Sequence, residues 1–124
     1  MDKLFIDKIE RIVTDRKVGY SNLTNASDLF KKFNEFDQEV YKDRSLKRKY
    51  KELIGLGSSI SNNCEPCMEW HISQALKFGA TRDQIIEGIE VGLEIGGGPA
   101  TVACRFALMV LDYYTIYKTV DSLK

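Results

Sequence analysis

Apolar residues recur every three or four positions along most of the chain, and the strict two-residue alternation of a half-buried strand is not found. The three-to-four-residue spacing places the apolar side chains on one face of an α-helix. The sequence therefore predicts an all-α fold of about six helices. We expect them near residues 2–13, 27–40, 42–62, 65–79, 81–96 and 99–120, with a break in the pattern at Gly19–Thr24.

Residues with known preferences for helix ends mark several of these boundaries. Ser27 is a candidate N-cap for the second helix. Thr81 and Gln84 have the spacing of a capping box at the start of the fifth helix. The glycine triplet at 96–98 lacks the preceding strand and the lysine of a phosphate-binding loop, so we interpret it as a helix end. Pro99 would then begin the last helix.

The last predicted helix is apolar on almost every side from Val102 to Leu111. A chain of 124 residues can hardly bury such a helix alone. In the preceding helix, Gly88, Gly92 and Gly96 recur every four residues and would let another helix approach closely. These features predict a homo-oligomer whose subunits cover the apolar surface. Cys104 lies on the last helix, where we expect a buried and unreactive thiol.

Composition and charge narrow the range of partners. The 18 basic and 18 acidic residues balance, so no net field attracts the chain to nucleic acid or to an anionic membrane. The basic run at 42–51 contains an apolar stripe, and we interpret it as the solvated face of a helix. The N-terminus has no apolar signal segment, and the run 102–111 is interrupted by Arg105. We expect a single domain over residues 1–124 in the cytoplasm, without nucleic-acid or membrane partners.

Residues suited to redox and acid–base chemistry gather around the start of the fourth helix. Cys64 and Cys67 form a C-x-x-C pair, and His71, the single histidine, follows four residues later on the same helix face. If the chain reverses at 62–63, Glu52 on the antiparallel helix comes within reach of His71, directly or through one water. The amides and the dipole at a helix start favour the thiolate form of cysteine. The pattern therefore predicts a redox-active cysteine pair with a Glu–His proton relay.

The motif E-x(11)-C-x-x-C-x-x-x-H, followed by A-x-x-x-G-A-T and I-x-E-x-I-E, resembles the alkylhydroperoxidase-D-like proteins of the carboxymuconolactone decarboxylase superfamily. The resemblance covers about residues 51–103. It implies an AhpD-like helical fold that assembles as an oligomer, with a hexamer favoured and a trimer or dimer as alternatives. Some peroxidase members carry a histidine between the two cysteines, where this chain has Glu65 and Pro66.

The same resemblance implies thiol-dependent reduction of hydroperoxides or disulfides. Glu52 and His71 would keep one cysteine as thiolate and protonate the leaving group. We favour Cys67 as the cysteine that attacks peroxide and Cys64 as the one that resolves the sulfenic acid. No cofactor or bound metal is expected. The electrons would come from a thiol reductant protein or a small dithiol.

Three other functions fit parts of the same pattern. Cys64, Cys67 and His71 could bind a metal with Cys104 or Glu52, although no second cysteine knuckle exists. A lyase of the carboxymuconolactone decarboxylase type would need a base and a carboxylate-binding pocket instead of a redox pair. A redox-sensing oligomer would form the disulfide without turnover.

Overall fold

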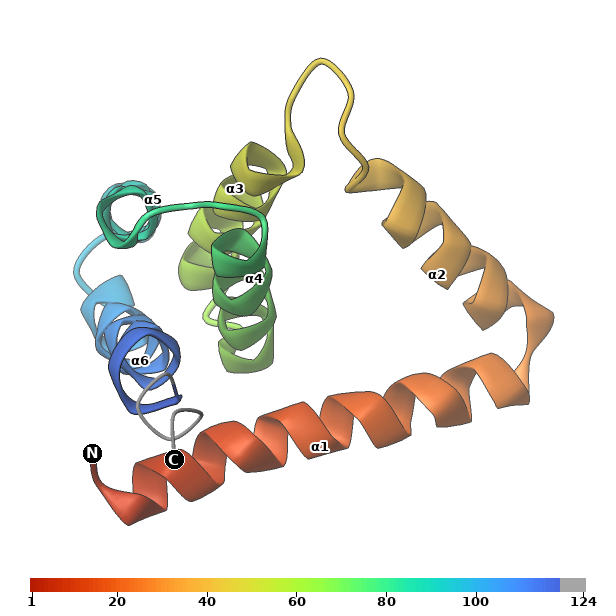
Figure 1. Cartoon of the computed structure of the whole chain (residues 1–124), viewed down its shortest axis with the longest axis horizontal. Helices are drawn as coiled ribbons and strands as arrows, with labels where there is room; N and C mark the ends of the chain where they lie inside the picture. The colour runs from red at the N-terminus through yellow and green to blue at the C-terminus, as the bar shows by residue number, and fades with distance from the viewer. Residues whose placement is uncertain (119–124) are drawn as a thin grey trace.

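The computed structural model describes residues 1–118, and every regular element in that range is helical (Figure 1). The elements are α1 (Lys3–Ala26), α2 (Asp28–Val40), α3 (Arg48–Ser61), α4 (Glu65–Lys77), α5 (Arg82–Gly96), α6 (Ala100–Asp112) and a π-helical turn, η1 (Tyr113–Tyr117). The prediction of an all-α fold with six helices is confirmed.

Helices α3, α4, α5 and α6 pack together and enclose most of the core (Figure 1). α3 and α4 lie side by side, and a short turn joins them at the end where α3 finishes. α1 crosses this group and buries Ile6 and Ile9 from its first half. α2 packs mainly against α1 and projects away from the other helices. The fully buried side chains of the core include Leu56, Ile60, Met68, Ile72, Ile85, Val110 and Leu111.

The glycine ridge of α5 is used inside the chain, against α3. A Cβ atom on Gly92 would lie 2.7 Å from Cβ of Ile60 and 2.9 Å from the carbonyl oxygen of Gly57. Gly88 likewise faces the Leu53 and Leu56 side chains. The close approach that the sequence predicted is therefore present, but its partner is α3 of the same chain. The ridge no longer argues for a subunit contact.

The predicted break at Gly19–Thr24 is wrong, because α1 continues through it to Ala26. Beyond Val13 the helix leaves the core, so its apolar periodicity fades while its backbone hydrogen bonding continues. No proline interrupts it. The end of α1 is set by Ser27, whose hydroxyl accepts from the Phe30 N–H as the predicted N-cap of α2.

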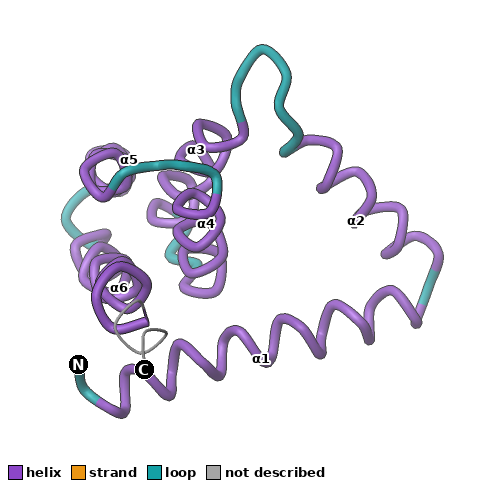
Figure 2. The backbone as a smooth tube through the Cα atoms, in the orientation of Figure 1, coloured by secondary structure: helices purple, strands orange, loops and turns teal. Residues whose placement is uncertain are grey.

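The prediction that the whole basic run at 42–51 is the solvated face of a helix is also wrong. Residues 41–47 form a loop, drawn in teal in Figure 2, and α3 begins only at Arg48. A carboxylate oxygen of Asp43 accepts the Arg48 N–H at 2.6 Å, which fixes the loop to the first turn of α3. Two cations of the run, Arg48 and Lys51, make specific hydrogen bonds that are described below.

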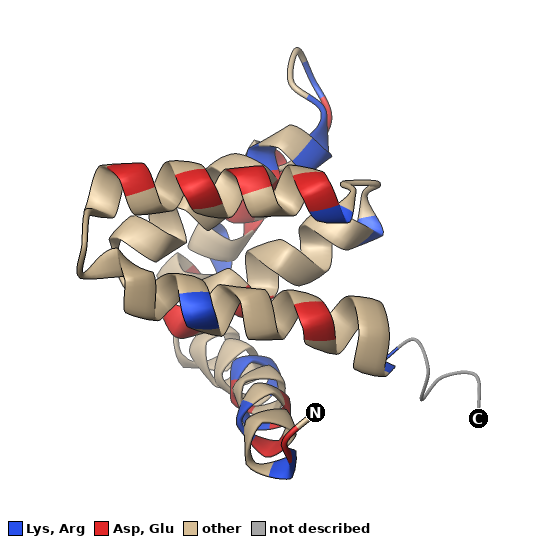
Figure 3. Cartoon of the chain, turned by 90° about the vertical axis from the view of Figure 1, so that its left-hand side faces the viewer, with Lys and Arg blue, Asp and Glu red and all other residues tan. Residues whose placement is uncertain are grey.

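The second half of the chain follows the predicted boundaries closely. Thr81 and Gln84 form the capping box, and α5 ends at Gly96 before Gly97, whose φ is 76°. Acidic residues recur along the whole length of α5 (Figure 3), and all of them are exposed. Cys104 is buried on α6, as predicted, and its burial raises the pKa of the thiol. The C-terminal part of the predicted last helix, including Val120, lies outside the described residues.

Candidate functional site

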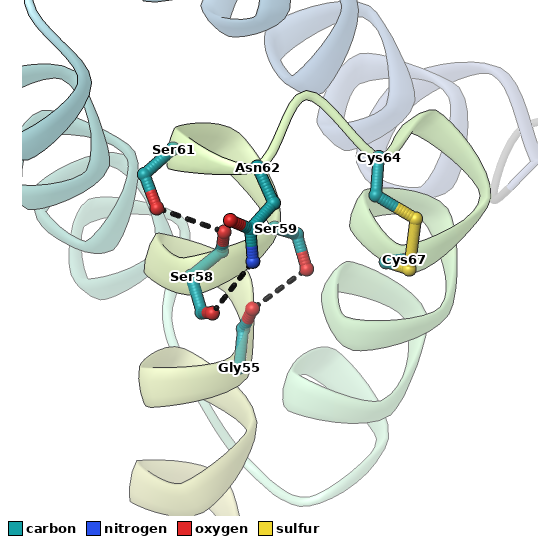
Figure 4. The surroundings of a disulfide bond; sticks show 7 residues. All are labelled: Gly55, Ser58, Ser59, Ser61, Asn62, Cys64 and Cys67. Atoms are coloured by element: carbon teal, nitrogen blue, oxygen red, sulfur yellow. Dashed lines mark hydrogen bonds between the residues drawn. A yellow bond between two sulfur atoms is a disulfide. The ribbon is translucent and has the colours of Figure 1, made fainter.

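The two cysteines meet at the start of α4. The chain reverses after Ser61 through Asn62 and Asn63, and Asn63 takes a left-handed φ of 52°. Cys64 is then the N-cap of α4, and its N–H donates to the carbonyl of Ser59 at 2.9 Å. Cys64 and Cys67 are joined by a disulfide with a Cα–Cα distance of 5.3 Å (Figure 4). Cys64 is half-buried and Cys67 is exposed, so Cys67 is the more accessible of the two residues.

Glu52 and His71 contact each other directly. Oε1 of the buried Glu52 lies 2.8 Å from Nδ1 of His71, without an intervening water. Because an ionised carboxylate can only accept hydrogen bonds, Nδ1 carries the proton in this pair. The other ring nitrogen, Nε2, is then the atom left to exchange protons with a substrate or a thiol. The predicted proximity of these two residues is confirmed, while their roles stay a prediction.

A third side chain completes the surroundings of Glu52. The Nε–H of Arg48, one turn earlier on α3, donates to Oε2 of Glu52 at 3.1 Å. The same guanidinium donates to the side-chain oxygen of Gln74 at 2.9 Å and lies 4.0 Å from the ring centre of Phe78. Both carboxylate oxygens are therefore satisfied, as a buried charge requires.

Gly55 on α3 gives the imidazole its space. A Cβ atom at this position would lie 2.6 Å from Cε1 of His71 and 2.8 Å from both ring nitrogens. Any side chain there would displace the ring. The site thus depends on a glycine one turn after Glu52, in the middle of a helix where glycine is otherwise unfavourable.

A cavity of about 340 Å³ lies against both cysteines and His71. It exposes both cysteines and His71 to a small molecule. No Lys, Arg, Asp or Glu is among the described residues that line it, so the cavity itself is neutral. The lining residues are Tyr41, Ile54, Gly55, Ser58, Ser59, Asn62, Cys64, Cys67 and His71.

The sequence analysis missed several residues that shape this site. Arg48 could have been found from its i, i+4 spacing to Glu52, which is typical of a helical ion pair. Gly55 and Tyr41 had no local signal, because their partner His71 is distant in sequence. Asp37 on α2 is electrostatically coupled to the site. Burial raises the pKa of its carboxyl, and the negative charge of Glu52 raises it further, while His71 and Arg48 act to lower it.

The metal-site alternative would draw its ligands from Cys64, Cys67, His71 and either Cys104 or Glu52. Cys104 does not line the cavity with Cys64, Cys67 and His71. Among the side chains of residues 1–118, no group of three or more His, Cys, Asp or Glu could hold a metal ion. No helix in the described part of the chain is long and apolar enough to cross a membrane.

The chain, including the candidate site, matches a known protein family. The model of the carboxymuconolactone decarboxylase family matches residues 27–108, a range that contains α2 to α5, most of α6 and the whole candidate site.

Two curated relatives align with a little over half of the chain. An uncharacterized protein of Cupriavidus necator is 39% identical over 70 residues, which cover 56% of this chain and 62% of that protein. Uncharacterized protein 4 in the cox locus of Paracoccus denitrificans is 37% identical over 73 residues, which cover 59% of this chain and 66% of that protein. The match thus spans slightly less than two thirds of each relative.

Solved structures align over most of the fold. A carboxymuconolactone decarboxylase family protein from Legionella pneumophila superposes with a TM-score of 0.81 at 26% identity, covering 88% of this chain and 98% of that one. A protein of the same family from Thermotoga maritima superposes with a TM-score of 0.82 at 25% identity, covering 90% and 95%. The Thermotoga protein is described as a candidate for involvement in the antioxidative response.

Proposed function

Since the chain belongs to the carboxymuconolactone decarboxylase family, we propose that it is a thiol-dependent oxidoreductase that reduces hydroperoxides or disulfides with Cys64 and Cys67. One observation carries the proposal: a cysteine pair able to form a disulfide shares a small cavity with a histidine that a buried glutamate orients. The description of the Thermotoga relative is in line with this chemistry.

In the proposed cycle, Cys67 acts as the nucleophile because it is the more exposed cysteine and lies in the first turn of α4. His71 accepts the thiol proton at Nε2, and the helix start stabilises the thiolate. The sulfur attacks one peroxide oxygen, so that an S–O bond forms and the O–O bond breaks. His71 returns the proton to the departing alkoxide or hydroxide, leaving a sulfenic acid on Cys67.

The sulfenic acid is then resolved by Cys64. Its sulfur attacks the Cys67 sulfur, the S–S bond forms, and the sulfenic oxygen leaves as water with the Cys64 proton. An external dithiol, either a thiol protein or a small molecule, reduces the disulfide and is itself oxidised to a disulfide. The net reaction converts one hydroperoxide and one dithiol to an alcohol, water and a disulfide. We propose that the working form is a homo-oligomer, with a hexamer favoured.

A lyase of the carboxymuconolactone decarboxylase type is less well supported by the geometry. A lactone that carries carboxylates calls for a permanent cation in the binding cavity, and no lysine or arginine is among the described residues that line it. The nearby cation, Arg48, already serves Glu52 and Gln74.

The test is steady-state reduction of hydrogen peroxide and of a small organic hydroperoxide with a dithiol as electron donor. Wild-type protein should turn over, and Cys67→Ser and Cys64→Ser should abolish turnover. Cys104→Ser is the matched control and should retain it, because its buried thiol lies outside the cavity. A single stoichiometric oxidation without turnover would refute the catalytic proposal and favour a redox sensor.

A further inference from the structure

We propose that Tyr41 and Lys51 form a positioning pair that holds the His71 imidazole in the orientation needed for the thiol chemistry. This inference rests on the function proposed above and adds two residues to it. Neither residue lies in the cysteine–histidine motif. Tyr41 follows the last residue of α2, and Lys51 precedes Glu52 on α3.

The ring of Tyr41 contacts the imidazole. Their centres lie 5.7 Å apart, with an angle of 33° between the ring planes. This distance falls within the range of favourable aromatic pairs. Tyr41 also lines the cavity beside both cysteines. The ring therefore restricts rotation of the imidazole and keeps water from part of its surface.

Tyr41 contacts the imidazole as an uncharged phenol. Burial raises the pKa of the Tyr41 phenol, and the negative charges of Glu52 and Asp37 raise it further, against the opposing effect of Arg48. The phenol accordingly stays protonated at neutral pH. The positioning effect belongs to the aromatic ring, which phenylalanine would also provide.

α2 alone does not hold Tyr41 in place. This helix has no buried side chain and packs mainly against α1. Lys51 supplies the missing connection: its Nζ donates to the carbonyls of Val40 and Lys42, each at 2.7 Å. These two carbonyls flank Tyr41 in the chain. An ammonium at the C-terminal end of α2 also satisfies the Val40 carbonyl, which belongs to the last turn of the helix and lacks an intrahelical partner.

The position of the imidazole is thus set largely from one stretch of α3. Glu52 accepts from Nδ1, and Gly55 leaves space for the ring. Lys51 fixes the backbone around Tyr41, whose ring contacts His71. With Nδ1 engaged and the ring held, Nε2 keeps a constant direction toward its reaction partner.

The proposal is tested by Tyr41→Ala, Tyr41→Phe and Lys51→Met, with Lys49→Met as the matched control. Lys49 lies on the same helix, but its ammonium is directed to the Tyr50 ring, at 5.2 Å from the ring centre. The first measurement is the rate at which dithiothreitol reduces the Cys64–Cys67 disulfide as a function of pH, which requires no peroxidase activity. The second is kcat/KM for hydrogen peroxide.

We expect Tyr41→Ala and Lys51→Met to lower both rates, up to about 10²-fold, and to change their pH profiles, because a displaced catalytic group loses its alignment. Tyr41→Phe and Lys49→Met should stay close to wild type. Proton NMR gives a further readout, since His71 is the single histidine. Its ring resonances should move in Tyr41→Ala and Lys51→Met and be retained in Tyr41→Phe.

Wild-type rates and pH profiles in Tyr41→Ala or in Lys51→Met would overturn the proposal for that residue. A Tyr41→Phe variant as slow as Tyr41→Ala would also overturn it, because the hydroxyl would then be responsible. If Lys51→Met is unfolded by circular dichroism, Lys51→Gln replaces it under the same criteria, and Lys51→Arg should restore the rate. If the wild type fails to turn over peroxide, the proposed function fails, while the disulfide-reduction rates still decide the positioning role.

Discussion

Glu52 has no exposed surface, and its two oxygens accept from His71 and from Arg48. A carboxylate withdrawn from water loses several kcal/mol of solvation, which its partners must offset. Removing one partner leaves part of that loss uncompensated. The glutamate therefore links the stability of α3–α4 packing to the orientation of the histidine.

The first prediction concerns this pair. Glu52→Gln and His71→Gln should each lower kcat/KM for peroxide by roughly 10²–10⁴-fold, the usual contribution of a general acid–base group. An amide in place of the Glu52 carboxylate is close to it in size, so the fold should persist. Peroxide kinetics across pH, with circular dichroism as the control for folding, check this. Wild-type kinetics in His71→Gln would contradict the relay.

At the residue scale, local spacing predicted part of the site. Cys64, Cys67 and His71 could be placed on one face because an α-helix has a fixed period. The position of Glu52 followed from the reversal between two helices. The contacts of Gly55 and Tyr41 with His71 could not be predicted, because they depend on the angle and distance between elements that a periodic pattern does not encode.

At the scale of the elements, the contact between α3 and α5 is fixed by glycine. The second prediction is that Gly92→Ala destabilises the protein by about 1–3 kcal/mol, the usual cost of overpacking. The added methyl would meet the Gly57 carbonyl and the Ile60 Cβ, and neither can move easily. Denaturant unfolding measures the change.

Gly19→Ala is the matched control for that substitution. Gly19 lies within α1, and a Cβ there would meet nothing within 4 Å. Alanine should stabilise the protein by about 0.5–1 kcal/mol, because it restricts the unfolded chain and favours the helix. Equal effects of both substitutions would show that packing does not distinguish the two positions.

The third prediction concerns Asp37 on α2. Its pKa is raised in the folded protein, mainly by burial and then by Glu52. The native state therefore holds this proton more tightly than the unfolded state, and stability falls as pH rises from the ordinary value of 3.8 through the raised value. Asp37→Asn should raise the thermal midpoint at pH 7 and have little effect below pH 3.8. Thermal unfolding at both pH values checks the sign, and an equal shift at both would contradict it.

Helix ends were predictable where a side chain itself makes the cap. Ser27, Thr81 and Gln84 act within three residues, so the sequence shows them directly. The extension of α1 beyond Val13 was not predictable from apolar periodicity, because that stretch packs little against the core. The 41–47 loop was missed because the apolar stripe of α3 continues into Leu46, which is exposed.

On the scale of the whole molecule, α2 presents apolar side chains to solvent. Leu29, Phe33 and Phe36 are 75%, 65% and 63% exposed. On α6, Val102 is also 57% exposed. Clustered exposure of large apolar residues is typical of surfaces that bind another protein. It supports the proposed homo-oligomer independently of the α5 glycines.

The fourth prediction is that the protein in solution has a mass well above the 14.2 kDa of one chain. Phe36→Lys should lower that mass, because a cation on the apolar side of α2 opposes its burial between subunits. Light scattering at micromolar concentration measures both. Lys32→Met, elsewhere on α2, is the control and should leave the mass unchanged. A wild-type monomer would refute the oligomer.

The disulfide closes a ring of only four residues, 64–67, within the opening turn of one helix. In the loop-entropy description, the stabilisation that such a bond gives grows with the logarithm of the ring size, so a ring of four residues contributes about 2 kcal/mol, at the low end of the usual range. The bond also links no two helices. Reduction should therefore lower the free energy of unfolding by no more than about 2 kcal/mol, and the helices around the pair should keep their packing while it cycles between dithiol and disulfide.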